Sequence, residues 1–303
     1  MDVLGIEVEP ALVRRWAGWL APACQPFFLT SDEIANLRLA PGCLADHVRW
    51  VDRPGPRYEL PAGLHDTYWE WNLPDGLDVV WLDEQVFQAL PRDVRAELVR
   101  AQVKHGRGAV PTTSGWTDLL DAQVLREQAD GQHFVWWPTL VEPRTDAVLK
   151  RVVSDDQLPC QRTSVPDDIW RTATSVLPHA RALAGTFANG GAGNCFGTVM
   201  GASGVQDAAA TWMPGEPFEA WLAANCAAGG GDDVPGTVLV WRNADGACTH
   251  AAVTLGGGWA LHKPGQDWIC PRQVVTVGDL IRLAPPGVTL HRNSLQTAGT
   301  QPA

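Results

Sequence analysis

Several features that mark whole classes of proteins are missing from this chain of 303 residues. It has no run of about eighteen apolar residues, so we expect no segment that spans a bilayer. The opening segment, Met1 to Glu7, has neither the cationic nor the apolar stretch of a secretory signal, so we expect no export. Only 23 side chains are basic against 34 acidic ones, and a net charge of -11 argues against nucleic acid and an anionic membrane surface as partners.

Paired cysteines are also missing. The 7 cysteines are widely spread and odd in number, which fits neither a disulfide framework nor a set of zinc ligands. The sequence lacks a Walker loop, a dinucleotide-binding glycine pattern and a His-Glu-x-x-His pair, so we expect no cofactor and no metal. We therefore expect a cytoplasmic protein with free thiols, in which each cysteine is a small buried hydrophobe unless its surroundings indicate otherwise.

The residues that are present suffice for folded domains, with 45% hydrophobic and 19% charged side chains. Prolines and acidic residues interrupt the pattern between Glu142 and Asp168, so we expect two domains, at residues 1–150 and 151–303. The first is expected to be a mixed α/β domain of unassigned fold that is rich in tryptophan. We expect most of the 15 tryptophans of the chain to be core residues rather than the lining of a ligand groove.

Hydrophobic periodicity predicts the regular elements on either side of this boundary. In the first domain we expect a helix at 10–20, a strand at 78–82, a helical stretch from 83 to 106 with a break near Pro91, and a strand at 133–138. In the second domain we expect a helical stretch at 169–183 interrupted by Pro178, a helix at 217–228, and strands at 234–241, 249–255 and 259–262. The glycines at 256–258 form a hairpin turn between the last two strands.

One cysteine has surroundings that indicate chemistry. Cys195 follows Asn194, a good N-cap, and precedes a short apolar segment, so it is expected in the first turn of a helix. The N–H groups and the positive end of the helix dipole would lower the pKa of its thiol, and the same N–H groups could hold an oxyanion. His250 and His262 stand on the two strands of the hairpin, so the first could act as a base that the second orients.

The ordered set of these segments resembles the NlpC/P60 family of cysteine peptidases, whose domains have a compact papain-like fold. The matching segments are the glycine-rich lead-in at 182–191, Asn194-Cys195-Phe196-Gly197, the strand from Pro235 to Trp241, and Thr249 to His262. The resemblance covers roughly residues 168 to 285. It implies an α+β papain-like domain with Cys195 as the nucleophile, His250 as the general acid/base and His262 as the residue that orients it.

Four positions depart from the family pattern. This chain has Asn194, Phe196, Phe187 and Thr237 where the family usually has Asp, Ser, Tyr and Asp. In members that cleave peptidoglycan, the groups that are lost here help to shape the subsite around the scissile bond. The resemblance therefore implies the reaction chemistry more than it implies a cell-wall peptide as the substrate.

Residues and resemblance together predict a thiol-dependent amide hydrolase or peptidase that acts through a Cys195 acyl-enzyme. Its partner would be a small-molecule or peptide substrate that carries an amide or acyl group. An amine acceptor in place of water would make the same acyl-enzyme an acyltransferase or amide synthase, and a catalytically silent binding scaffold is a third alternative. The segment from Gln266 to Trp268 could contact the substrate or form a polar loop, and the sequence leaves the oligomeric state open.

Overall fold

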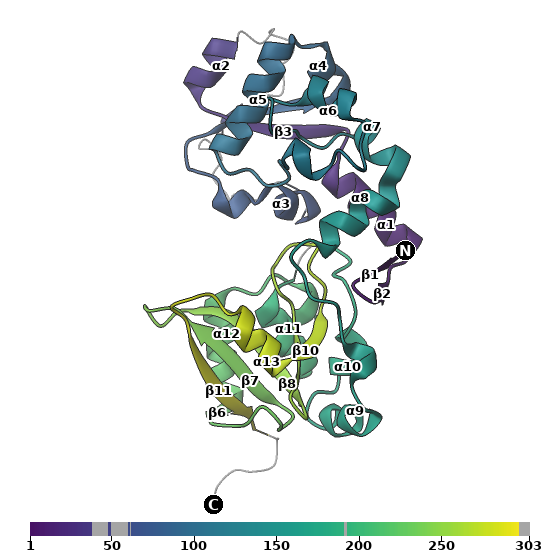
Figure 1. Cartoon of the computed structure of the whole chain (residues 1–303). Helices are drawn as coiled ribbons and strands as arrows, with labels where there is room; N and C mark the ends of the chain where they lie inside the picture. The colour runs from purple at the N-terminus through teal and green to yellow at the C-terminus, as the bar shows by residue number, and fades with distance from the viewer. Residues whose placement is uncertain (38–47, 50–59, 61, 191–192, 297–303) are drawn as a thin grey trace, which may run out of the picture. The chain divides into compact units, whose positions relative to one another are not determined.

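The computed structural model describes residues 1–37, 48–49, 60, 62–190 and 193–296 (Figure 1). Its contacts divide the chain into two compact units: unit 1 contains Met1 and Glu9–Val152, and unit 2 contains Asp2–Val8 and the chain from Val153 onward. Each unit combines helices with an antiparallel sheet, so the fold is mixed α+β. None of the helices in the described ranges is both long and apolar enough to cross a membrane.

Unit 1 is built on a three-stranded antiparallel sheet in the order β3 (Cys24–Leu29), β5 (Asp78–Asp83) and β4 (Val48–Arg49). Two helices follow β5 directly, α4 (Glu84–Ala89) and α5 (Arg92–Lys104), with the break between them at Leu90 and Pro91. Phe27, Phe87 and Trp137 stack in the core beside these elements, and all three are completely buried. The helical stretch expected after residue 83 is thus two helices, because Pro91 offers no N–H to continue the first one.

The remaining helices of unit 1 are α1 (Pro10–Leu20), α2 (Ser31–Leu37), α3 (Ala62–Tyr68), α6 (Ala122–Gln128), α7 (Pro138–Val141) and α8 (Thr145–Ser154), the last of which runs into the boundary. α1 has the bounds that its apolar spacing predicts. Pro10 occupies the first turn, where its missing N–H is not needed, and Trp16 and Leu20 lie on the buried stripe of the helix.

One expected strand of unit 1 is not formed. His133 makes a single isolated bridge to Thr112, and the buried apolar residues that follow it pair with no neighbouring strand among the described residues. Pro138 instead begins α7, with Trp137 in an extended conformation before it. A proline fits the first turn of a helix because its missing N–H would have no partner there. The strand predicted at 133–138 is therefore wrong.

Unit 2 contains a six-stranded antiparallel sheet in the order β10-β9-β8-β7-β11-β6. The strands are β6 (Cys226–Ala228), β7 (Thr237–Arg242), β8 (Cys248–Gly256), β9 (Trp259–His262), β10 (Gln273–Thr276) and β11 (Thr289–Leu295). From β7 to β10 each strand pairs with the next along the chain, so residues about a dozen positions apart lie side by side. A separate two-stranded sheet joins β1 (Asp2–Val3) to β2 (Ile6–Glu7).

The helices of unit 2 are α9 (Asp167–Thr174), α10 (Ala180–Leu183), α11 (Cys195–Ala202), α12 (Gly215–Asn225) and α13 (Val277–Leu283). α11 contacts β8 and β9, and its residues from Phe196 to Ala202 are all buried. Val277 and Leu280 of α13 pack into a core with Trp241 and Ala252 of the sheet. The sheet core and α11 together place the first residue of α11 beside the strands that carry the two histidines.

Candidate active site

The N-terminus of α11 is held by one asparagine side chain. Asn194 lies before the helix in an extended conformation, and its Oδ1 accepts a hydrogen bond from the Gly197 N–H at 3.0 Å. Its Nδ2 donates to the carbonyl oxygen of Met213 at 2.6 Å, which ties the helix start to the segment before α12. An N-cap asparagine satisfies an otherwise unpaired donor of the first turn, so Cys195 becomes the first residue of the helix.

Two glycines let the backbone come close around this cysteine. Gly193 has a φ of +132°, and a Cβ at this position would lie 2.8 Å from the carbonyl oxygen of Ala209. A Cβ on Gly197 would lie 2.3 Å from the carbonyl oxygen of Ala208. Neither distance is compatible with a side chain, so the chain at 208–211 packs directly on the first turn of α11.

The two histidines lie on neighbouring strands and contact each other. β8 pairs with β9 in a register that places Ala252 opposite His262, so His250 lies two residues along on the same face. The His250 Nε2 and His262 Nδ1 atoms are 3.3 Å apart, and the rings meet edge to face with centroids at 5.5 Å. The hairpin expected from the glycines at 256–258 thus brings these side chains into hydrogen-bond distance.

A fourth polar residue, Gln273 on β10, continues this chain of side chains. β10 pairs with β9 so that Gln273 lies opposite His262, and the two Nε2 atoms are 3.2 Å apart. Gln273 is only 2% exposed, and its Oε1 has no hydrogen-bond partner among the described residues. Sequence reasoning missed Gln273. The available signal was a single amide at the start of an otherwise apolar segment, Gln-Val-Val, which is unusual for a buried strand.

The orientation of the Gln273 amide determines where the protons of both histidines lie. With Nε2 facing His262, the amide donates to the His262 Nε2 atom, so His262 carries its proton on Nδ1 and donates to His250 Nε2. His250 then carries its own proton on Nδ1. Rotating the amide by 180° turns Oε1 toward His262 and reverses every donor, which leaves a lone pair on His250 Nδ1. Only the second arrangement lets His250 accept a proton through Nδ1.

Burial keeps the cysteine and both histidines uncharged. It raises the pKa of the Cys195 thiol above its ordinary value, although hydrogen bonds from the N–H groups of Ala251 and Phe196 and the charge of Lys263 oppose the shift. Burial lowers the pKa of His250 to about 4. It also lowers the pKa of His262 well below its ordinary value, with a further contribution from the charge of His250. The direction at Cys195 is opposite to the one expected from the helix N-terminus, because loss of hydration outweighs the N–H groups.

The hydrogen bond from the Ala251 N–H places the Cys195 sulfur against β8, at the residue that follows His250. The structure thus brings His250, His262 and Gln273 into contact with one another, and it places the Cys195 thiol against the backbone of the residue that follows His250. Two buried cations adjoin these residues along the chain: Lys263 follows His262, and Arg272 precedes Gln273. The Nζ of Lys263 donates to the carbonyl oxygens of Gly265 and Asp267 at 2.6 and 2.8 Å, and Arg272 donates to the backbone of Ala209 and to the Thr186 hydroxyl.

Two other thiols of unit 2 lie in surroundings that suppress their reactivity. Cys248 donates to Glu219 Oε1 at 2.8 Å, and burial together with this carboxylate raises the pKa of its thiol to about 12. Burial raises the pKa of Cys226 to about 11. Neither lies at a helix N-terminus. Of these three thiols, only Cys195 lies at a helix N-terminus and against the strand that carries His250.

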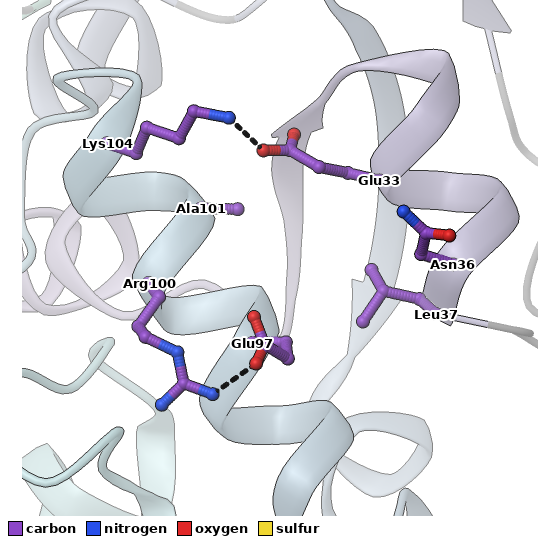
Figure 2. Close-up of a pocket in the computed structure, with 7 residues that line it drawn as sticks. All are labelled: Glu33, Asn36, Leu37, Glu97, Arg100, Ala101 and Lys104. Atoms are coloured by element: carbon purple, nitrogen blue, oxygen red, sulfur yellow. Dashed lines mark hydrogen bonds and ion pairs between the residues drawn. The ribbon is translucent and has the colours of Figure 1, made fainter.

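A hollow on unit 1 lacks comparable chemistry. Its lining residues, drawn in Figure 2, are Glu33, Asn36, Leu37, Glu97, Arg100, Ala101 and Lys104. Glu33 pairs with the Lys104 Nζ at 2.7 Å and with the His105 Nε2 at 2.8 Å, and these contacts hold the pKa of its carboxyl at about 2 despite the opposing effect of burial. The Glu33 carboxylate in this hollow is thus already paired with neighbouring side chains. In the described ranges of the chain, no group of three His, Cys, Asp or Glu residues could hold a metal ion.

Comparison with known protein families, with curated proteins and with solved structures finds no match to this chain. The resemblance to the NlpC/P60 family rests on the sequence segments quoted above. The function is therefore argued from the geometry of the site and from the chemistry of its residues.

Proposed function

We propose that unit 2 is a papain-like thiol hydrolase of the NlpC/P60 kind that cleaves an amide bond through an acyl-enzyme on Cys195. One observation carries the proposal: the Cys195 sulfur lies at a helix N-terminus against the Ala251 N–H, and the preceding residue of that strand is His250, whose Nε2 faces His262. Nucleophile, base and orienting residue are the parts that thiol acyl chemistry requires. The substrate class that follows is a small molecule or peptide with an amide or acyl group.

The reaction begins when His250 Nδ1 accepts the thiol proton as the Cys195 sulfur attacks the carbonyl carbon. A C–S bond forms, and the carbonyl oxygen becomes an oxyanion that N–H groups at the start of α11 can stabilise. His250 then gives the proton to the leaving amine nitrogen, the C–N bond breaks, and a thioester remains. Water attacks this thioester while His250 accepts its proton, the C–S bond breaks to release the acid, and His250 returns the proton to the sulfur, which restores the thiol.

His262 and Gln273 act in this scheme through His250. With the Gln273 Oε1 turned toward His262, the His262 Nδ1 accepts a hydrogen bond from the His250 Nε2–H, and His250 Nδ1 keeps a lone pair that can take the thiol proton. Because burial favours the neutral thiol and the neutral imidazole, we expect proton transfer to accompany attack rather than to precede it as a resting ion pair.

Alkylation of the native protein by iodoacetamide tests this proposal. Each cysteine is quantified by mass spectrometry across a pH series. We expect Cys195 to react fastest of the cysteines. In the His250→Ala variant, Cys195 should react about 100-fold more slowly than in the wild type, since a positioned base accelerates such a reaction by about this factor. Cys248→Ala is the matched control and should leave the Cys195 rate unchanged. A Cys195 rate no higher than that of the other thiols would overturn the proposal and favour a silent binding scaffold.

A second experiment distinguishes hydrolysis from acyl transfer. Incubation with p-nitrophenyl acetate should give a burst of nitrophenol and an acetyl adduct on Cys195. Release of acetate in water supports the hydrolase. Release that occurs only when an amine is added, with formation of the acetamide, would replace hydrolysis by amide synthesis on the same acyl-enzyme.

A further inference from the structure

One tryptophan of unit 2 differs from the rest. The Trp212 side chain is 48% exposed, whereas Trp170, Trp241 and Trp268 are nearly completely buried, and no other tryptophan in the described part of unit 2 is classed as exposed. The indole is nevertheless held in one position, because its Nε1 donates to Gln266 Oε1 at 2.8 Å. An exposed indole whose edge is fixed leaves its ring face open to another molecule.

The place of Trp212 relative to the nucleophile follows from contacts on both sides of the site. Its neighbour Met213 accepts the hydrogen bond from Asn194 Nδ2, and Asn194 directly precedes Cys195. On its other side, the Thr211 carbonyl oxygen would lie 3.0 Å from a Cβ on Gly197. The segment that carries Trp212 is thus packed on the first turn of α11.

Gln266, the partner of the indole, belongs to the segment that carries the second histidine. It follows His262 by four positions, and the intervening Lys263 holds this segment by donating to Gly265 and Asp267. The bond between Trp212 and Gln266 therefore joins the cysteine side of the site to the histidine side. The exposed indole therefore lies on two segments, one that contacts the first turn of α11 and one that follows His262.

We infer that Trp212 forms a binding subsite for an apolar, preferably aromatic, side chain of the acyl substrate attacked by Cys195. The inference rests on the proposed function and narrows its substrate class. Stacking of an aromatic ring on the indole buries apolar surface of both and gains from the offset or edge-to-face contact of the rings. A partner protein segment on the same indole would be the alternative, and it predicts no effect on the reactivity of Cys195.

The test compares two alkylating probes that react at the same sulfur, iodoacetamide and N-benzyl-2-iodoacetamide. Their rates at Cys195 are measured by mass spectrometry and divided by their rates with glutathione, which removes the intrinsic reactivity of each probe. We expect the wild-type protein to favour the benzyl probe by about 10-fold, the advantage expected from stacking plus apolar burial. Trp212→Ala should remove this preference and leave the iodoacetamide rate unchanged.

Three further variants make the result specific. Trp212→Phe keeps an aromatic face and should retain part of the preference. Gln266→Ala frees the indole edge and should reduce the preference to an intermediate value. Trp71→Ala, at a 37% exposed tryptophan of unit 1, is the matched control and should change nothing.

The possible outcomes distinguish the subsite from the proposed function. Equal preference in wild type and Trp212→Ala overturns the subsite while leaving Cys195 chemistry in place. A loss of both rates in Trp212→Ala and Trp212→Phe, with an unchanged unfolding temperature, assigns Trp212 a structural role and also overturns the subsite. If neither probe labels Cys195 of the wild type above its glutathione-normalised background, the proposed function falls, and the subsite with it.

Discussion

Gln273, a residue of the sheet, influences which nitrogen carries the proton on His250, two side chains away. Its amide contacts His262, and His262 contacts His250, so each hydrogen bond fixes which nitrogen of the next ring carries a proton. A base at Nδ1 of His250 requires an acceptor at the far end of this chain. Glutamine can provide one with Oε1, and it provides a donor when its amide is turned round.

Replacement of Gln273 by residues of similar size tests this coupling. Gln273→Glu offers only acceptor oxygens and a negative charge, so we expect the pKa of both imidazoles to rise and Cys195 alkylation to begin at lower pH. Gln273→Leu removes the acceptor and should lower the rate by about 10-fold, as general-base assistance is weakened. The pH profile of iodoacetamide labelling measures both effects. Identical profiles for the Glu and Leu variants would contradict the coupling.

The low pKa of His250 also predicts how stability depends on pH. Its pKa is about 4 in the folded protein against an ordinary 6.5, so the unfolded chain takes up the proton first as the pH falls. Stability is complete above pH 6.5 and is lost as the pH falls toward 4, by up to about 3 kcal/mol from this group. Denaturant unfolding at pH 7 and pH 4.5 measures the loss. His250→Gln, which cannot be protonated, should show a smaller loss between the two pH values, and an equal loss would contradict the assignment.

At the scale of elements, the close packing of α11 on the chain at 208–211 depends on a missing side chain. Gly197→Ala would place a Cβ 2.3 Å from the Ala208 carbonyl oxygen, and the backbone must move to relieve the overlap. We expect a loss of at least about 2 kcal/mol in the free energy of unfolding, measured by denaturant titration. Gly215→Ala, in the first turn of α12 where a Cβ meets nothing within 4 Å, is the control and should be neutral or slightly stabilising. Equal effects of the two substitutions would be inconsistent with this packing.

The elements that the sequence predicts are those with local signals. α1 has a proline in its first turn and a regular apolar stripe, and the hairpin of β8 and β9 has consecutive glycines at its turn. β11 has no such signal, because its polar sequence Thr-Leu-His-Arg-Asn-Ser-Leu becomes a strand by pairing with β7, which lies far earlier in the chain. Pairing between distant segments also explains why the sequence does not predict β3 and β6.

In the candidate site, too, the residues with a local sequence pattern could be predicted, and the residue placed by strand register could not. Cys195, His250 and His262 could be singled out because an N-cap, a helix start and a hairpin turn are local patterns. Gln273 could not, because its role depends on the register of β10 against β9. The direction of the Cys195 pKa was also not predictable, since it depends on burial by residues from several elements.

At the scale of the whole molecule, the segment Asp2–Val8 belongs to unit 2 although unit 1 follows it directly along the chain. Val3, Ile6 and Val8 are buried, and the Leu4 carbonyl oxygen accepts a hydrogen bond from the Cys160 N–H at 2.8 Å. Ile6→Ala should therefore cost about 2–3 kcal/mol of stability in unit 2 and leave unit 1 unaffected, because the removed methyl groups leave a cavity only in the former.

Hydrogen exchange followed by mass spectrometry can locate this loss. In Ile6→Ala, peptides from residues 153–165 should exchange faster, while peptides from α5 in unit 1 should not change. Glu7→Ala, at an exposed position of the same strand, is the matched control. Faster exchange throughout both units would contradict the assignment of β1 and β2 to unit 2.

This assignment makes unit 1 an insertion into unit 2, since the chain leaves unit 2 after Val8 and returns to it at Val153. On the ribosome, the β1–β2 segment emerges before unit 1, but the rest of unit 2, on which it packs, is synthesised only after Val152. Unit 1 is complete by that point and can fold while unit 2 is still unfinished. We therefore expect unit 1 to fold before unit 2 during synthesis, although unit 2 begins earlier along the chain.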